Sequence, residues 1–128
     1  MVRFRDCDAL GHVNNAVYLT YLEQARFTLW KEQFELPPGR DRKPGVIMAR
    51  VEIDYRSPAR YGDELDIRVT LDAIGRSSFT YSYEVLDTAG GRLIAQAKTV
   101  QVHFDYEQNK AVRIDDDLRA SLSRPVTR

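Results

Sequence analysis

The chain has 128 residues, 43% of them hydrophobic and 30% charged, which suits a single domain over 1–128 and leaves no room for a second core of ordinary size. Its 19 lysines and arginines balance 19 aspartates and glutamates, so we expect no nucleic-acid partner, because proteins that bind nucleic-acid phosphates carry a basic excess. No apolar run approaches the roughly 18 residues that span a bilayer, and the first residues lack the apolar stretch of a secretory signal, so we expect a cytoplasmic protein without membrane contact.

A long helix is predicted near the N-terminus, over about 14–34. This stretch contains no proline or glycine, and apolar side chains such as Tyr18 and Leu22 recur in it at helical spacing. Asn14 or Asn15 is a suitable N-cap, because an asparagine oxygen can accept a hydrogen bond from an unpaired N–H of the first turn. The apolar surface of this helix is too wide for one sheet edge, so a sheet must curve around it.

Elsewhere in the chain, apolar and polar residues alternate as in strands that have one wet face. Val51, Ile53 and Tyr55, for example, alternate with acidic residues, and glycines at Gly75 and Gly90 mark tight turns between the later strands. The expected strands cover 2–6, 51–55, 65–73, 79–85 and 94–104, with a short helix over 115–122. This order of a first strand, a long helix and an antiparallel meander predicts an α+β fold.

Four or five antiparallel strands curved over one helix leave two sheet edges and part of the helix in solvent. Pairing with further copies of the chain would cover these surfaces. We therefore expect a homodimer or a homotetramer.

The densest cluster of reactive side chains, over 6–15, lies between the first expected strand and the long helix. The N–H groups of a first helical turn are unpaired and carry the positive end of the helix dipole. They can hold an oxyanion formed on a substrate carbonyl while a neighbouring carboxylate attacks the carbonyl or activates water. The arrangement suits acyl transfer to water.

Structural interpretations of the same segment remain open. An aspartate in a turn before a helix commonly caps a backbone N–H, and a turn histidine is commonly only hydrogen-bonded. Asp6 is the weaker candidate, either an outward polar residue of the strand or a partner for Arg3 or Arg5. Cys7 is interpreted as a small, semi-buried residue, and one cysteine with two histidines cannot form a structural zinc cage, so no metal site is expected.

Residues 5–15, which read Arg-Asp-Cys-Asp-Ala-Leu-Gly-His-Val-Asn-Asn, resemble the signature of hotdog-fold acyl-CoA thioesterases of the 4-hydroxybenzoyl-CoA thioesterase-like group. Further matches extend the resemblance over nearly the whole chain, at Tyr18, Tyr21, Leu22, Glu23, Ala25, Arg26, 55–59, 62–65 and 75–78. The resemblance implies a hotdog fold, in which an antiparallel sheet wraps around one long central helix. That fold agrees with the order of elements expected from periodicity.

The resemblance also implies roles for individual residues. Asp8 holds the place of the catalytic carboxylate, as nucleophile or as general base, and the backbone N–H of Asn15 polarises the thioester carbonyl. The related plant acyl-carrier-protein thioesterases have a histidine four positions after the aspartate, as His12 is here, but also an asparagine where this chain has Leu10. An Asp-Asn-His network is therefore not available, and His12 is left as an orienting or acid/base residue.

A second carboxylate, Glu23, falls where other hotdog thioesterases place one on the helix. Arg26, three residues later, makes an ion pair with Glu23 an equal alternative. We rank Glu23 after Asp8.

Coenzyme A carries phosphates, so its binding site needs basic groups and hydroxyl donors. The candidates are Arg56, Arg60, Arg76, Ser57 and Ser77, with a further basic loop at Arg40, Arg42 and Lys43. The acyl pocket is expected between the helix and the sheet or between two subunits, lined by residues such as Tyr18, Leu22, Phe79 and Tyr81.

The leading hypothesis is an acyl-CoA thioesterase that needs no metal or organic cofactor, with an acyl-carrier protein as an alternative carrier of the acyl group. Two other functions remain open, because a fold does not determine an activity. One is a hotdog dehydratase or hydratase acting on acyl thioesters. The other is an acyl-CoA-binding module without catalytic activity.

Overall fold

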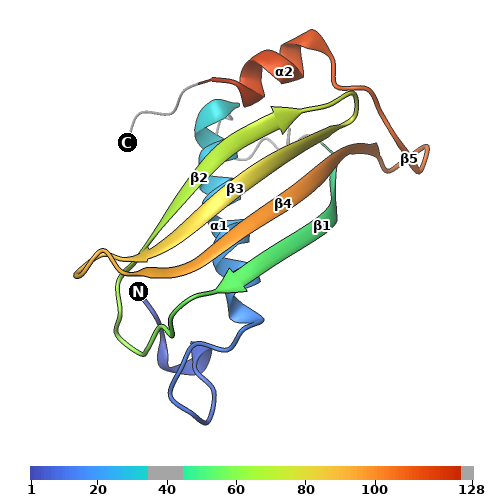
Figure 1. Ribbon diagram of the computed structural model, residues 1–128. Coiled ribbons are helices and arrows are strands. Elements are labelled where there is room, and N and C mark those ends of the chain that lie inside the picture. Colours follow the sequence, from blue (N-terminus) through green and yellow to red (C-terminus); the bar gives the residue numbers. More distant parts are fainter. Residues whose placement is uncertain (35–44, 125–128) are drawn as a thin grey trace.

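The computed structural model describes residues 1–34 and 45–124. In this part of the chain, an antiparallel sheet lies over a long helix, with shorter elements toward both ends (Figure 1). The elements in chain order are the 3₁₀ helix η1 (Phe4–Asp6), α1 (Val17–Gln33), β1 (Val46–Tyr55), β2 (Leu65–Ile74), β3 (Ser78–Asp87), β4 (Leu93–Asp105), β5 (Lys110–Ala111) and α2 (Asp116–Leu122). The predicted α+β class is confirmed.

The main strands form one sheet in the order β1, β4, β3, β2, with the short β5 paired to β4. Strands β2, β3 and β4 follow one another as the predicted antiparallel meander, whereas β1 pairs with β4 from the other side. β1 and β2 are therefore far apart in the sheet although they are neighbours in sequence. The alternation that predicted β3 is confirmed by burial, since Phe79, Tyr81, Tyr83 and Val85 are all buried.

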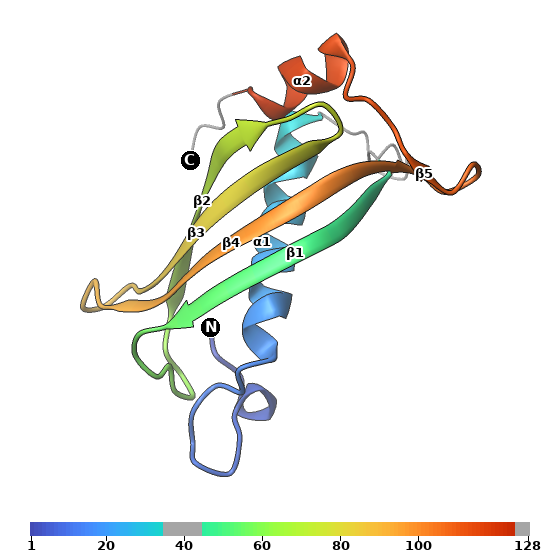
Figure 2. The same ribbon diagram turned by 45° about the vertical axis from the view of Figure 1, so that its right-hand side comes forward.

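Helix α1 lies against one face of this sheet (Figures 1 and 2). Its buried residues recur every three or four positions, which is the helical spacing that predicted it: Tyr18, Leu22, Arg26, Trp30 and Gln33. The indole Nε1 of Trp30 donates a hydrogen bond to the hydroxyl of Tyr81 on β3 at 2.7 Å. Burying these large side chains is the main source of stability at the contact between the helix and the sheet.

The start of α1 differs slightly from the prediction. The helix begins at Val17 with Ala16 as its N-cap, and the Oδ1 of Asn14 accepts from the N–H of Ala16 at 2.9 Å in a turn just before the helix. The carbonyl of Asn14 also accepts from the N–H of Val17 at 2.9 Å. The predicted N-cap at Asn14 or Asn15 is therefore wrong, because the N-cap is Ala16 and no side chain caps the first turn.

The predicted strand over 2–6 is wrong. Phe4–Asp6 forms a 3₁₀ helix, because the carboxylate of Asp6 accepts a hydrogen bond from the backbone N–H of Arg3 and thereby closes a turn. Only Val2 keeps an extended pairing, donating to the carbonyl of Asp63 at 2.9 Å and accepting from Gly62 at 3.0 Å.

The first strand of the sheet is longer than the predicted 51–55 and begins at Val46. The pairing of β1 with β4 shifts register between Met48 and Arg50, and this irregularity interrupts the alternation that periodicity relies on. The other predicted strands lie within or close to the observed bounds. The predicted terminal helix is confirmed as α2, where Asp115 caps the N–H of Leu118 at 2.7 Å.

In the described part of the chain, no helix has the length and apolar character needed to cross a membrane.

Candidate active site

The segment that joins η1 to α1 folds into a small closed loop over 7–13. Cys7 and Val13 pair as an isolated antiparallel bridge at its base. Just inside this bridge, the N–H of Asp8 donates to the carbonyl of His12 at 2.8 Å. Cys7 is partly buried, as predicted. The pairing fixes the main chain on both sides of Asp8.

Two further features hold this loop in place. Gly11 has a φ of 79°, which glycine adopts without the steric cost of a side chain. The loop is also tied to the segment after β1, because His12 forms an isolated bridge with Arg60 and the N–H of Val13 donates to the carbonyl of Ala59 at 2.8 Å. The loop is thus braced by a part of the chain more than 40 positions away.

Asp8 projects from this loop and is exposed. Its Oδ1 accepts a hydrogen bond from the N–H of Leu10 at 2.9 Å and a longer one from the N–H of His12 at 3.4 Å. These contacts are the turn bonds expected of a structural aspartate. They use one carboxylate oxygen, while Oδ2 has no hydrogen-bond partner among the described residues. The side chain can therefore be oriented by the turn and still present an oxygen to a ligand.

Asn15 lies just before α1, between Asn14 and the N-cap residue Ala16. The N–H of Asn14 is occupied by the carbonyl of Asp6, and the N–H of Ala16 by the side chain of Asn14. In the described part of the chain, the N–H of Asn15 has no hydrogen-bond acceptor. It is a donor at the positive end of the helix that is available to a ligand.

A cavity of about 380 Å³ brings many of the predicted site residues together. It lies between the 7–13 loop, the start of α1 and the end of β1. Its lining contains Asp8, Leu10, His12, Val13, Asn15, Tyr18, Tyr55, Arg56, Ser57 and Pro58. The three residues predicted to be catalytic therefore share one cavity with three of those predicted to bind substrate.

One wall of the cavity is formed by two tyrosines. The rings of Tyr18 and Tyr55 meet edge to face, with centroids 5.4 Å apart, and the hydroxyl of Tyr55 donates to the carbonyl of Asn15 at 3.0 Å. Tyr55 was expected as a strand residue and as part of the 55–59 match to the thioesterase family, but not as a residue of the site. A sequence does not show which loop the strand end will meet.

The cavity lining also contains one arginine, Arg56, beside Ser57. Arg56 donates to Gln96 at 3.2 Å and lies 3.8 Å from Asp54, and both of its contacts are at the surface. The hydroxyl of Ser57 accepts from the guanidinium of Arg92 at 2.9 Å. Arg92 was not among the residues predicted to bind substrate. It follows the second glycine of a hairpin turn and belongs to no motif that would have indicated a role in binding.

Other predicted substrate-binding residues are not lining residues of this cavity. Arg60 is adjacent to it, and its N–H donates to Asp63. Arg76 and Ser77 lie in the turn between β2 and β3, at the opposite end of the sheet from Tyr55, as the strand register shows. The predicted basic loop of Arg40, Arg42 and Lys43 lies outside the described residues.

Most of the residues suggested for the acyl pocket belong to the core, which is also what we expect of most of them from the sequence. Leu22, Phe79 and Tyr81 are at most 1% exposed, and of the suggested set only Tyr18 reaches the cavity. The alternative of a Glu23–Arg26 ion pair is wrong. Glu23 is exposed, whereas Arg26 is buried and donates to the hydroxyl of Tyr83 at 3.2 Å.

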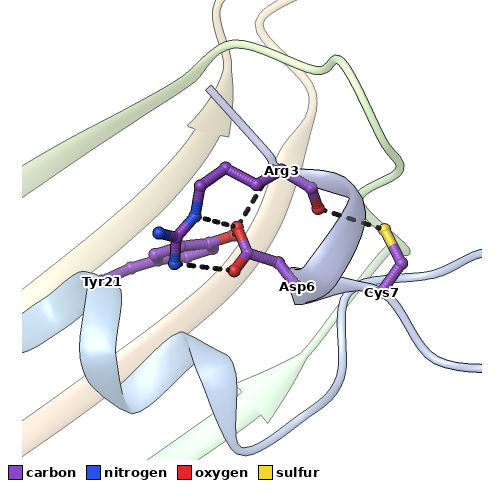
Figure 3. A network of polar contacts seen from close by, with 4 residues as sticks. All are labelled: Arg3, Asp6, Cys7 and Tyr21. Atoms are coloured by element: carbon purple, nitrogen blue, oxygen red, sulfur yellow. Dashed lines mark hydrogen bonds and ion pairs between the residues drawn. The ribbon is translucent and has the colours of Figure 1, made fainter.

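Directly beside the loop, Asp6 forms a buried polar network with Arg3 and Tyr21 (Figure 3). Its carboxylate accepts from the Arg3 guanidinium at 3.0 and 3.3 Å and from the Tyr21 hydroxyl at 2.7 Å. The hydrogen bonds from Arg3 hold the pKa of Asp6 at about 2, against the opposing effect of burial. The prediction that Asp6 pairs with Arg3 is confirmed, and the alternative of an outward polar residue is wrong.

This network predicts a specific acid dependence of stability. Because the pKa of Asp6 is about 2 in the folded chain and about 4 in an unfolded one, its ionised form stabilises the fold fully above about pH 4 and loses this effect as the pH falls through about 2. We expect Asp6→Asn to lower the melting temperature most above pH ~4. Thermal unfolding of both proteins across this range measures the difference, which should shrink toward pH ~2. A difference that stays constant with pH would contradict the assignment.

Comparison with known proteins supports a relationship over nearly the whole chain. The family model described as the thioesterase-like superfamily matches residues 2–122. The long-chain acyl-CoA thioesterase FadM of Escherichia coli (strain K12) is 29% identical over 125 residues, which cover 98% of this chain and 95% of that protein. The 1,4-dihydroxy-2-naphthoyl-CoA hydrolase of Synechococcus sp. (strain CC9605) is 30% identical, over 90% of this chain and 80% of its own.

Solved structures agree with the architecture. A thioesterase from Thermus thermophilus, crystallised with coenzyme A and Zn, superposes with a TM-score of 0.80 at 32% identity, over 96% of this chain and 93% of that one. The match of the family model over most of the chain, together with a sheet laid over a long helix, shows that the chain belongs to the thioesterase-like superfamily and has the hotdog fold.

Proposed function

We propose that this protein is an acyl-CoA thioesterase, which hydrolyses a thioester to a free carboxylic acid and coenzyme A. The observation that carries the proposal is the presence, in one cavity, of the Asp8 carboxylate and the unpaired N–H of Asn15. The first can activate or perform the attack on a carbonyl carbon, and the second can hold the negative charge that the attack places on the carbonyl oxygen. The names of the relatives are consistent with this chemistry.

In the general-base form of the reaction, Asp8 takes a proton from water as the water oxygen bonds to the carbonyl carbon. The N–H of Asn15 donates to the resulting oxyanion. Collapse of this intermediate breaks the carbon–sulfur bond, and the proton on Asp8 passes to the departing thiolate. The products are a carboxylic acid and a thiol, so no metal, redox partner or organic cofactor is needed.

Asp8 can also act as a nucleophile. Its oxygen then bonds to the carbonyl carbon, the thiolate leaves, and water hydrolyses the mixed anhydride to restore the carboxylate. After a single turnover in water labelled with heavy oxygen, label in the Asp8 side chain supports the nucleophilic form, since it arises only when water attacks the Asp8 carbonyl of the anhydride.

His12 and Tyr18 support this chemistry from the cavity wall. His12 is partly buried and lines the cavity with Asp8, a place from which it can orient the substrate or move a proton. Tyr18 lines the cavity with His12, and burial raises the pKa of its hydroxyl. We propose that His12 and Tyr18 belong to the site and that Asp8 performs the chemical step.

The nucleotide end of coenzyme A is expected where Arg56 lines the cavity. Ser57 lines the cavity beside it, and Arg60 is adjacent. Guanidinium groups suit phosphate oxygens because they donate in a planar fork. Arg76 and Ser77 are remote from this cavity, so their role as substrate-binding residues stays a prediction.

Further parts of the proposal concern the state of the protein. We propose one hotdog domain over 1–128 that assembles as a homodimer or homotetramer. Apolar side chains on α1 and on the edge strand β1 are 40–46% exposed, which supports a covering partner: Leu19, Phe27, Val51 and Tyr55. The cytoplasmic location and the use of an acyl-carrier protein stay predictions.

The test is thiol release from a panel of acyl-CoAs with short, medium, long and aromatic acyl groups. We expect the purified protein to release free thiol from at least one of them, and the preferred ester defines the acyl class. Hydration of crotonyl-CoA, followed in parallel, tests the dehydratase or hydratase alternative. Binding of the esters with neither reaction would contradict the thioesterase and favour a binding module.

A further inference from the structure

We infer that Arg3, Asp6 and Tyr21 are positioning residues of the active site, which set the place of Asp8 relative to the N–H of Asn15. The inference rests on the proposed thioesterase function. It assigns a task to a polar network that touches no part of the cavity, since none of the three residues belongs to the cavity lining.

The side chain of Asp6 connects two separate parts of the chain. One oxygen, Oδ2, accepts from the backbone N–H of Arg3 at 2.9 Å and from the Tyr21 hydroxyl at 2.7 Å, while Oδ1 accepts from the Arg3 guanidinium at 3.0 Å. Tyr21 belongs to the second turn of α1, whereas Asp6 ends η1 (Figure 3). The N-terminal segment is therefore attached directly to the helix.

The main chain of Asp6 continues the same connection. Its carbonyl accepts from the N–H of Asn14 at 2.8 Å, and Asn14 directly precedes the proposed oxyanion donor Asn15. On the other side, only Cys7 separates Asp6 from Asp8. Asp6 thus bonds to the helix through its side chain and to the segment that leads into the helix through its carbonyl, and it lies two positions from the reacting carboxylate.

The network is suited to fix a position because it is charged and centred on a buried carboxylate. The Asp6 side chain is 3% exposed and its partner Arg3 is 48% exposed, so the carboxylate is shielded from water while the guanidinium reaches the surface. Hydrogen bonds with an ionised partner are about twice as strong as neutral ones. Breaking one of them leaves a buried charge under-satisfied, so alternative positions of the loop are strongly disfavoured.

Asp8 itself has little that holds it against the helix. Its side chain is exposed and bonds only to its own loop. Its distance from the N–H of Asn15 therefore depends on where the loop is attached. A displacement of about 1 Å at a reacting group can lower a rate by about 10²-fold, so loosening this attachment is expected to reduce turnover without removing any group that contacts substrate.

The test is a double-mutant cycle between Tyr21→Phe and Asp8→Asn. Tyr21→Phe deletes one hydroxyl and keeps the ring. We expect it to lower kcat by roughly tenfold, with KM close to that of the unchanged protein and a lower melting temperature, because the buried Asp6 carboxylate loses one donor. In the Asp8→Asn protein, the same change should have no further effect on the residual rate, because groups that act through one another are not additive.

Tyr61→Phe is the matched control, because Tyr61 is 64% exposed and lies outside the network, and it should leave kcat unchanged. Arg3→Lys, which keeps the charge, should lose less activity than Arg3→Met. An equal loss of rate from Tyr21→Phe in both backgrounds would overturn the inference and leave the proposed function intact. Full turnover by Asp8→Asn would overturn both.

Discussion

Asp8→Asn should lower kcat for acyl-CoA hydrolysis by roughly 10²–10⁴-fold, the usual contribution of a positioned acid or base. The amide is close in size to the carboxylate, and its oxygen can still accept from the N–H groups of Leu10 and His12. The loop should therefore keep its shape. An amide is neither an effective base nor a nucleophile, so the loss falls on the chemical step. Thiol release at saturating acyl-CoA measures it.

The chain offers a matched control in Asp105. Its Oδ1 accepts from the N–H groups of Glu107 and Gln108 at 2.9 and 3.1 Å, the same kind of turn contact that Asp8 makes. Asp105→Asn should keep normal turnover because Asp105 is not part of the cavity lining. If both variants lost activity equally, the loss in Asp8→Asn would be explained by a changed turn and not by the loss of a reacting carboxylate. Near-normal turnover in Asp8→Asn would contradict a catalytic role for Asp8.

Phe79→Ala is expected to have the largest effect on stability, a loss of about 3–5 kcal/mol. Phe79 is 0% exposed, and its ring packs against Trp30 at 6.3 Å and Tyr81 at 5.6 Å between centroids. Truncation removes these contacts and leaves a cavity under α1 that the surrounding rings cannot close. Since domains of this size are stable by only about 5–15 kcal/mol, a large fraction of the total is lost.

Equilibrium unfolding in urea measures this loss through the midpoint and slope of the transition. Phe4→Ala serves as the control, because it removes the same atoms from a side chain that is 80% exposed and should change stability little. A similar loss in both variants would mean that Phe79 is not part of the core. An unchanged midpoint for Phe79→Ala would contradict the packing between β3 and α1.

Local periodicity was enough to predict most of the architecture. The apolar spacing of α1 and the alternation in β3 follow from which side of each element is buried, and this pattern is present in the sequence itself. The motif over 5–15 placed Asp8, His12 and Asn15 close together in sequence, and all three line the observed cavity.

Periodicity failed where a local pattern was overridden by partners far along the chain. Residues 2–6 alternate as a strand would, but the buried Asp6 pairs with Tyr21, 15 positions later, and η1 forms instead. The early part of β1 was missed because a register irregularity breaks its alternation. In both places the deciding interaction is tertiary.

The sequence by itself determined the elements, their order and the short segment that carries the reactive groups, because those properties depend on side-chain type at fixed local spacing. Only the tertiary structure decided that β1 joins β4 and that the Tyr55 hydroxyl meets Asn15 across 40 positions. Only the tertiary structure also separated the predicted substrate-binding residues. Arg56 and Ser57 line the cavity, whereas Arg76 and Ser77 lie at the other end of the sheet. Such contacts depend on strand pairing and loop closure between distant segments, and no local pattern encodes that pairing.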